Sequence, residues 1–185
     1  MSGNRDTSVR PPFPPLTWRE PNWEGEIVLP EWQEYDEGER KEFPWKDRTL
    51  KCDLLVSRDD CEDQEMDACQ VNAWQFLLSN GEAIRKAVLE ALLPYYEKLR
   101  PRWAEFYDEE VMSDIMPVIS GPDDFRPLIL LTSITLNPWE RDGMAYVGFC
   151  FRCKWDIEHG LGFLVHGITV AKTGGAEVSF LPADH

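Results

Sequence analysis

The sequence predicts a single α+β domain in which a mainly antiparallel sheet carries a central helix pair packed on one face. A chain of 185 residues with 43% hydrophobic content is long enough for one sizeable core and short for two. Stretches that alternate apolar and polar residues flank a central stretch with helical periodicity. No internal repeat is visible. We expect residues 18–185 to form this one domain.

The first 17 residues differ in composition from the rest of the chain. They are rich in serine and charge and include Pro11, Pro12, Pro14 and Pro15. Proline fixes φ and removes a backbone donor, which disfavours both helix and sheet interiors. We therefore expect residues 1–17 to be a Pro-rich N-terminal arm with extended, unpaired backbone that lies on the domain or trails from it.

Two short stretches predict the first strands. The residues WEGEIVLPEW, 23–32, alternate in character until Pro30 ends the pattern, and TLKCDLLVS, 49–57, is rich in β-forming residues. The last third predicts further strands at LILLTSITL, MAYVGFCFRCKWD, GFLVHGITV and AEVSF, with Gly174-Gly175 as the turn between the final two. Together these segments predict an antiparallel run of hairpins.

Helical signals occupy the middle of the chain. Asp67 stands three residues before Gln70, which is the spacing of a capping box, and apolar residues follow at helical intervals. Asn80-Gly81 interrupts this period, so the region forms two helices or one bent helix. A shorter helix is expected to end before Pro117.

The charge balance indicates the kind of partner. The chain has 34 acidic and 19 basic residues, a formal charge of −15, which disfavours nucleic acid and anionic membrane surfaces and favours basic proteins. We expect contact through acidic segments at residues 36–42, 59–67 and 108–110. The partner-binding candidates in the densest segment are Asp59, Asp60, Glu62, Asp63, Glu65 and Asp67. The plain alternatives are solubility and, for acids that precede a helix, complementation of its dipole.

The cysteines and the absence of apolar runs predict a soluble cytoplasmic protein. Neither a signal-peptide core nor a stretch of about 20 apolar residues occurs. Five cysteines in such a chain indicate free thiols in a reducing compartment. Cys150 and Cys153 have zinc-ligand spacing, but residues three apart in a strand point to opposite faces. We expect no disulfide, no metal and no cofactor.

The stretch CKWDIEHGLGF, residues 153–163, contains the candidate catalytic residues Asp156, Glu158 and His159. Two carboxylates and an imidazole suit general acid–base chemistry or a divalent cation. In an extended strand Asp156 and Glu158 would share one side. The alternative is a structural turn, in which such side chains accept backbone hydrogen bonds and the glycines allow the chain to reverse. No phosphate loop, G-x-S-x-G or H-E-x-x-H motif accompanies them.

Three segments together carry a resemblance to a known family. They are residues 23–32, the helical segment Trp74 to Asn80, and the C-terminal stretch that contains WDIEHGLG, residues 155–162, followed by GGAEVSF. Over most of residues 20–181 the chain resembles a family of uncharacterised bacterial domains. The resemblance implies a common fold and a bacterial origin, with Trp155, Gly160 and Gly162 as a structural motif, and it assigns no catalytic residue.

Three function classes remain open. The first is a non-enzymatic acidic binding protein of the bacterial cytoplasm, of the immunity type that neutralises a basic protein; this one we favour. The second is a hydrolase or divalent-metal-binding protein that uses Asp156, Glu158 and His159. The third is an accessory or structural subunit that docks through aromatics in loop-like contexts, namely Trp18, Trp32, Trp45 and Trp139.

Overall fold

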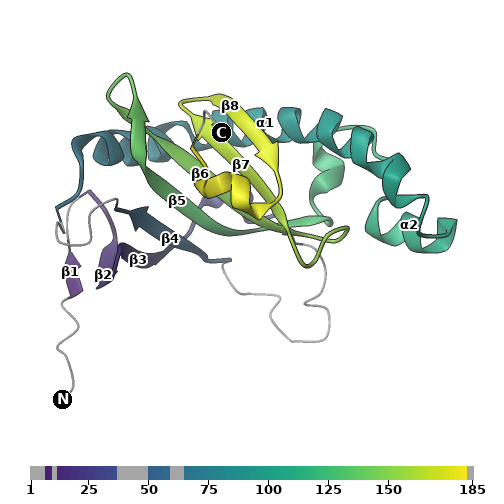
Figure 1. Cartoon of the computed structure of the whole chain (residues 1–185), viewed down its shortest axis with the longest axis horizontal. Helices are drawn as coiled ribbons and strands as arrows, with labels where there is room; N and C mark the ends of the chain where they lie inside the picture. The colour runs from purple at the N-terminus through teal and green to yellow at the C-terminus, as the bar shows by residue number, and fades with distance from the viewer. Residues whose placement is uncertain (1–6, 10–11, 37–49, 59–64, 183–185) are drawn as a thin grey trace, which may run out of the picture.

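A computed structural model describes residues 7–9, 12–36, 50–58 and 65–182, in which eight strands form one open sheet whose spatial order follows the chain (Figure 1). All neighbouring strands pair antiparallel except β4 and β5, which run parallel. The predicted single α+β domain with a mainly antiparallel sheet is confirmed. The strands are β1 Thr7–Val9, β2 Pro15–Arg19, β3 Asn22–Ile27, β4 Cys52–Ser57, β5 Ile129–Arg141, β6 Met144–Cys153, β7 Leu161–His166 and β8 Thr169–Gly174.

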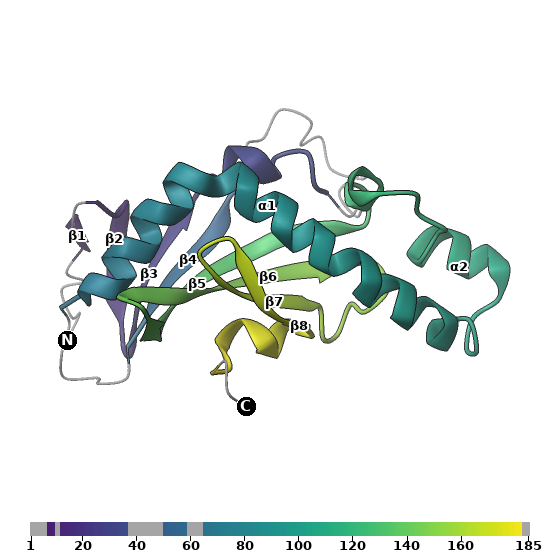
Figure 2. The same cartoon turned by 90° about the horizontal axis from the view of Figure 1, so that it is seen from above.

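In the described part of the chain, the helices comprise one long element, one short element and three 3₁₀ turns. They are α1 Ala68–Trp103, α2 Glu109–Ile115, η1 Pro30–Trp32, η3 Pro122–Phe125 and η4 Ala176–Phe180. Figure 2 shows α1 running along the sheet, with α2 beyond its C-terminal end. Asn80 has φ of −128° and ψ of 18°, so α1 is two helical segments joined where the periodicity breaks. Among the described helices, none has the length and apolar character needed to cross a bilayer.

One apolar stripe of α1 supplies the helical side of the core. Its buried members recur every four residues on both sides of the break at Asn80, and they join one cluster with the strands. These members are Ala73, Leu77, Ile84, Val88, Leu92 and Tyr96. From β6 the alternate residues Val147, Phe149 and Phe151 belong to the same cluster. Residues between them face the other side of the sheet, where η4 contacts β6 and β7.

The C-terminal strands differ from the prediction in two places. The stretch GFLVHGITV is two strands joined by a tight turn at Gly167, whose φ of 60° is a conformation that glycine adopts without strain. The stretch AEVSF, predicted as a strand, is the 3₁₀ helix η4. The hairpin turn therefore comes before β8, and Gly174-Gly175 instead leads the chain back across the sheet.

The predicted unpaired arm is also wrong for part of its length. Residues 7–9 pair with β2, and β2 pairs with β3. Pro15 is tolerated because it is the first residue of β2, a position where proline occurs in sheets. Phe13 and Leu16 are buried, and Phe13 stacks on Trp74 with ring centroids 5.5 Å apart. Two apolar side chains among the prolines thus fix the segment to α1.

Three of the four tryptophans predicted to lie in loop-like contexts fall within the described residues. Trp32 is buried, with its ring edge-on to Phe151 at 5.0 Å. Trp18 and Trp139 are partly buried, and Trp45 lies outside the described residues. Within the described residues, Trp18, Trp32 and Trp139 therefore do not lie in exposed loops as the third function class expected.

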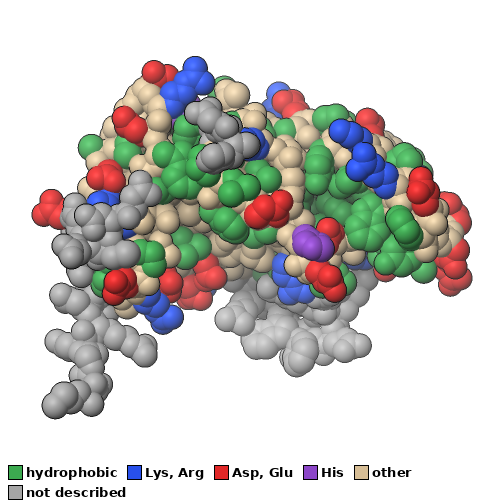
Figure 3. All heavy atoms as spheres, in the orientation of Figure 1, with side chains coloured by type: hydrophobic (Ala, Val, Ile, Leu, Met, Phe, Trp, Pro, Cys, Tyr) green, Lys and Arg blue, Asp and Glu red, His purple; other side chains and the backbone are tan. Residues whose placement is uncertain are grey.

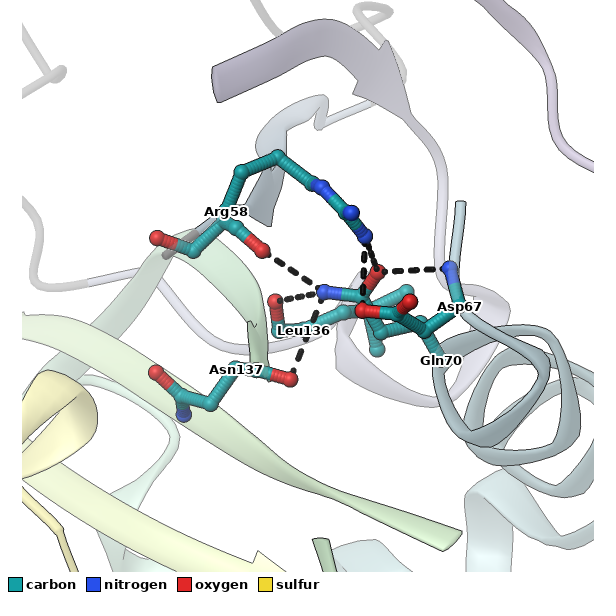
Figure 4. A network of polar contacts seen from close by, with 6 residues as sticks. Arg58, Asp67, Gln70, Leu136 and Asn137 are labelled. Carbon is teal, nitrogen blue, oxygen red and sulfur yellow. Dashed lines mark hydrogen bonds and ion pairs between the residues drawn. The ribbon is translucent and has the colours of Figure 1, made fainter. Parts of the chain in front are cut away.

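Gln70 joins the start of α1 to the end of β4 and to the middle of β5 (Figure 4). Its side-chain amide nitrogen donates to the carbonyl oxygens of Ser57 at 2.7 Å, Leu136 at 3.2 Å and Asn137 at 3.3 Å. Its carbonyl oxygen accepts the Asp67 backbone N–H at 3.3 Å, which is one half of the predicted capping box. Gln70 is fully buried, so these groups have no access to water.

We expect Gln70→Leu to lower the free energy of unfolding by about 2–4 kcal/mol, because leucine fills the space and leaves buried carbonyls without their donor. Urea denaturation measures this loss. Gln75→Leu, on the exposed side of the same helix, is the matched control and should change stability by less than about 0.5 kcal/mol. Equal effects for the two variants would show that the buried amide is not a structural tie.

Candidate functional site

The stretch with the catalytic candidates connects β6 to β7, and Trp155 anchors it. Trp155 is buried, and its ring meets Tyr96 of α1 edge-on at 5.2 Å. Tyr96 meets Phe125 of η3 in the same geometry at 5.2 Å, and its hydroxyl donates to the Pro117 carbonyl at 2.8 Å. The turn is therefore packed against α1 and against the segment that follows α2.

Asp156 closes this turn on itself. Its carboxylate oxygen Oδ1 accepts the His159 backbone N–H at 3.0 Å and lies 3.0 Å from His159 Nδ1. Its carbonyl accepts the Gly160 N–H at 2.9 Å. Since the backbone turns here, the expectation that Asp156 and Glu158 share one side of an extended strand is wrong. Glu158 is exposed, while Asp156 is largely covered.

Backbone conformation and close packing require glycine at both Gly160 and Gly162. Gly160 has φ of +64°, which suits glycine. A Cβ on Gly162 would collide with the carbonyl oxygen of Gly175, which crosses directly over the strand. The His159 carbonyl accepts the Ala176 N–H at 3.0 Å. The turn thus positions the start of η4, which accounts for its glycines by packing alone.

His159 is the electrostatically perturbed member of the cluster. The hydrogen bond and the charge of Asp156 raise the pKa of His159 above its ordinary 6.5, with smaller contributions from Glu158 and Glu177. Its side chain is 72% exposed. In the described part of the chain, no three His, Cys, Asp or Glu side chains are placed to hold a metal ion. Chemically, the arrangement is a solvated imidazole–carboxylate pair.

The acidic segment predicted to bind the partner is only partly described. Asp59, Asp60, Glu62 and Asp63 lie outside the described residues. Glu65 and Asp67 are exposed. Asp67 is the N-cap residue of α1 and forms an ion pair with Arg58 at 2.6 Å, so its charge already has a structural use.

A second acidic surface surrounds the junction of α1 and α2. Residues 103–125 contain no lysine or arginine, and their carboxylates are Glu105, Asp108, Glu109, Glu110, Asp114, Asp123 and Asp124. We call Glu105, Asp108, Glu109 and Glu110 the distal acidic end; all four are exposed. Acidic side chains are visible over α2 at the right of Figure 3, beside hydrophobic ones. Sequence reasoning named residues 108–110 but missed Glu105 and the long gap in basic residues.

Cations from outside this segment offset little of the charge. Arg100 lies 3.9 Å from Glu109, whose side chain is 88% exposed, and Lys154 pairs with Asp114 at 2.9 Å. Exposed pairs of this kind contribute about 0–1 kcal/mol and leave most of the field intact. Arg102, in the last turn of α1, is also exposed. The distal acidic end therefore keeps an excess of negative charge, with four carboxylates beside Arg100 and Arg102.

A groove on the open face of β2–β4 is the other candidate. It has a volume of about 440 Å³, and its charged lining residues are Arg19, Glu24, Glu26 and Asp53. Arg19 pairs with Glu24 at 3.3 Å, and Lys51 pairs with Glu26 at 3.0 Å. These carboxylates are largely balanced, so the groove offers a weaker site for a cation than the distal acidic end.

Comparison with known proteins identifies a family and no activity. A family model described as Domain of unknown function (DUF6985) matches residues 23–181. This agrees with the predicted resemblance to an uncharacterised family over most of residues 20–181. The comparisons with curated proteins and with solved structures gave no match.

We expect Asp156→Ala to lower the free energy of unfolding by about 1 kcal/mol, the usual cost of losing a side chain that caps a backbone N–H. Thermal or urea unfolding measures it. Glu158→Ala removes an exposed carboxylate two residues away and should stay within about 0.5 kcal/mol. If Glu158→Ala proved the more costly change, the turn would not depend on Asp156.

The His159 pKa gives a second test of the same pair. Because its folded pKa is raised, the Asp156–His159 attraction is fully present below the ordinary pKa of 6.5 and is lost as pH rises through the folded value. NMR titration of the imidazole should give a pKa above 6.5, and Asp156→Asn should lower it more than Glu158→Gln does. The reverse order would assign the shift to Glu158.

Proposed function

The chain belongs to the DUF6985 family of domains of unknown function, and for this member we propose binding of a basic protein partner through its acidic surface. The observation that supports this most is the distal acidic end, four exposed carboxylates in a stretch without lysine or arginine. In this proposal the protein is an immunity-type neutraliser in the bacterial cytoplasm, which acts by occupying its partner and needs no cofactor.

The physical advantage of such a surface is speed and selectivity. A formal charge of −15 attracts cationic surfaces at long range, and the local excess of negative charge orients the approach. Steering of this kind raises association rates by factors of about 10 to 10³ and is screened over about 8 Å at physiological ionic strength. A neutraliser gains from a fast association rate because it must intercept its target before the target acts.

Helix stability alone does not require this concentration of acid. Asp108 caps α2 by accepting the Val111 N–H at 3.0 Å, which satisfies the ordinary need of a helix start. Glu109 and Glu110 add favourable interactions with the helix dipole, each about 0.3–1 kcal/mol. Glu105 precedes the helix and makes neither contribution. Binding accounts for all four carboxylates together.

The alternative of a hydrolase or metal-binding protein lacks comparable support. It depends on Asp156, Glu158 and His159, yet Asp156 Oδ1 is engaged by the turn backbone and by His159. Glu158 and His159 are exposed. Catalytic groups usually have pKa values shifted by burial, and the shift at His159 comes from a neighbour in a solvated turn.

We expect the combined variant Glu105→Gln, Asp108→Asn, Glu109→Gln and Glu110→Gln to weaken binding of basic proteins by at least about tenfold at low salt. Tagged protein is incubated with lysate, bound proteins are eluted in steps of rising salt, and each is quantified by mass spectrometry for variant and wild type. Asparagine retains the cap of α2, so the fold should survive.

The matched control neutralises four exposed carboxylates elsewhere, with Glu20→Gln, Glu90→Gln, Glu140→Gln and Asp142→Asn. It should retain the same proteins with a modest loss that reflects net charge. If control and distal variants lose binding equally, the local surface has no special role. If wild type retains no basic protein at low salt, the proposed function is wrong.

A further inference from the structure

The distal acidic end surrounds hydrophobic side chains that the fold leaves in solvent. Phe106 is 78% exposed, Tyr107 43% and Val111 37%. Trp103, at the last turn of α1, is partly buried and stacks on Tyr107 with ring centroids 5.8 Å apart and planes 17° apart. We call Trp103, Phe106, Tyr107 and Val111 the aromatic platform. It lies within nine consecutive residues, interleaved with the four carboxylates.

Elsewhere in the described residues most exposed large apolar side chains stand singly, and the adjacent Phe180 and Leu181 are the exception, at 50% and 39% exposed. Leu78 and Ile168 are 55% and 54% exposed, and each is isolated in the sequence among polar or buried neighbours. Scattered residues of that kind need no explanation, whereas adjoining apolar side chains with a polar rim mark interaction surfaces. Tyrosine, tryptophan and phenylalanine are also the residues enriched at the centres of protein interfaces.

The segment is held in place from several directions. Arg100 Nε donates to the Met116 carbonyl at 2.9 Å, and Met112 and Met116 are fully buried. Lys154 of the β6–β7 turn also pairs with Asp114 of α2 at 2.9 Å. The aromatic platform is therefore presented on a rigid support, which lowers the entropy cost of binding.

Charge decides what occupies this surface. A second copy of the chain would bring Glu105, Asp108, Glu109 and Glu110 against the same residues in a symmetric contact, where like charges repel. Anionic lipid and nucleic acid phosphates are repelled for the same reason. The occupant that the charge favours is a cationic protein segment. Its side chains must also pack against the stacked rings of Trp103 and Tyr107.

Arginine fits both requirements better than lysine. Its planar guanidinium stacks on aromatic faces and pairs with carboxylates through two parallel hydrogen bonds, whereas the lysine ammonium is a compact, strongly hydrated charge. Resting on the proposed function, we propose that the aromatic platform and the distal acidic end together bind an arginine-bearing segment of the basic partner. The guanidinium stacks on Tyr107 and pairs with the surrounding carboxylates.

Two synthetic peptides of equal length and charge test this directly, one of alternating arginine and glycine and one of alternating lysine and glycine. Isothermal titration calorimetry at low salt measures both against the full chain. We expect the arginine peptide to bind about two- to fivefold more tightly, which is the factor that an exposed cation–π contact supplies. Tyr107→Ala should reduce arginine binding to the lysine level.

Phe180→Ala, at a half-exposed aromatic on η4, is the matched control and should leave both affinities unchanged. Phe106→Ala provides a second platform variant at a site too exposed to disturb folding, and it should also weaken arginine binding. Circular dichroism verifies that each variant is folded.

The outcomes separate this inference from the proposed function. If both peptides bind equally and Tyr107→Ala has no effect, while the variant with four neutralised carboxylates weakens both, then charge alone binds and the aromatic platform has no role. If neither peptide binds, the proposed function is wrong along with the inference. The same holds if the peptides bind the variant with four neutralised carboxylates as tightly as they bind wild type.

Discussion

The fold depends on the long connection between β4 and β5, which parallel pairing of these two strands makes necessary. Strands β4 and β5 are parallel neighbours, so about seventy residues, including α1 and α2, must leave one strand end and return to start the next. Gln70 lies where β4 ends, where α1 begins and where β5 leaves the pairing with β4. A single buried amide contacts backbone carbonyls of both strands and the first turn of the helix. With that point fixed, the apolar stripe of α1 meets the sheet in one register.

The other face of the sheet is held by the C-terminal segment. Asn137 donates to the Ser179 carbonyl at 3.1 Å, and the β6–β7 turn holds the start of η4 through His159. Gly162 lets this segment cross so closely that backbone meets backbone. The WDIEHGLG stretch therefore has one consistent use from Trp155 to Gly162: it turns the chain, buries an aromatic ring and receives the returning C-terminal segment. None of these uses requires the stretch to take part in a chemical reaction.

Much of the fold follows from local sequence. Alternation in residues 144–153 and helical spacing after Asp67 identify elements because the buried face repeats with the period of the backbone. The same logic failed at AEVSF, where the apolar pattern is compatible with several conformations and contact with β6 and β7 favours the 3₁₀ helix. It failed again in residues 7–17, where proline content hid the anchoring of Phe13 and Leu16. These outcomes depend on tertiary partners that no short window contains.

The sequence predicted part of the charge of the distal acidic end, and it did not predict that the aromatic platform beside it is exposed. The acids at residues 108–110 are evident in the sequence, whereas the exposure of Phe106 and Tyr107 depends on where α1 ends. Because α1 continues to Trp103 and α2 begins only at Glu109, both rings fall on the linking segment between them. That linker cannot bury them against the sheet, which α1 already covers. The exposed platform is thus a consequence of how the long helix terminates, and the carboxylates around it determine that only a cationic surface can approach.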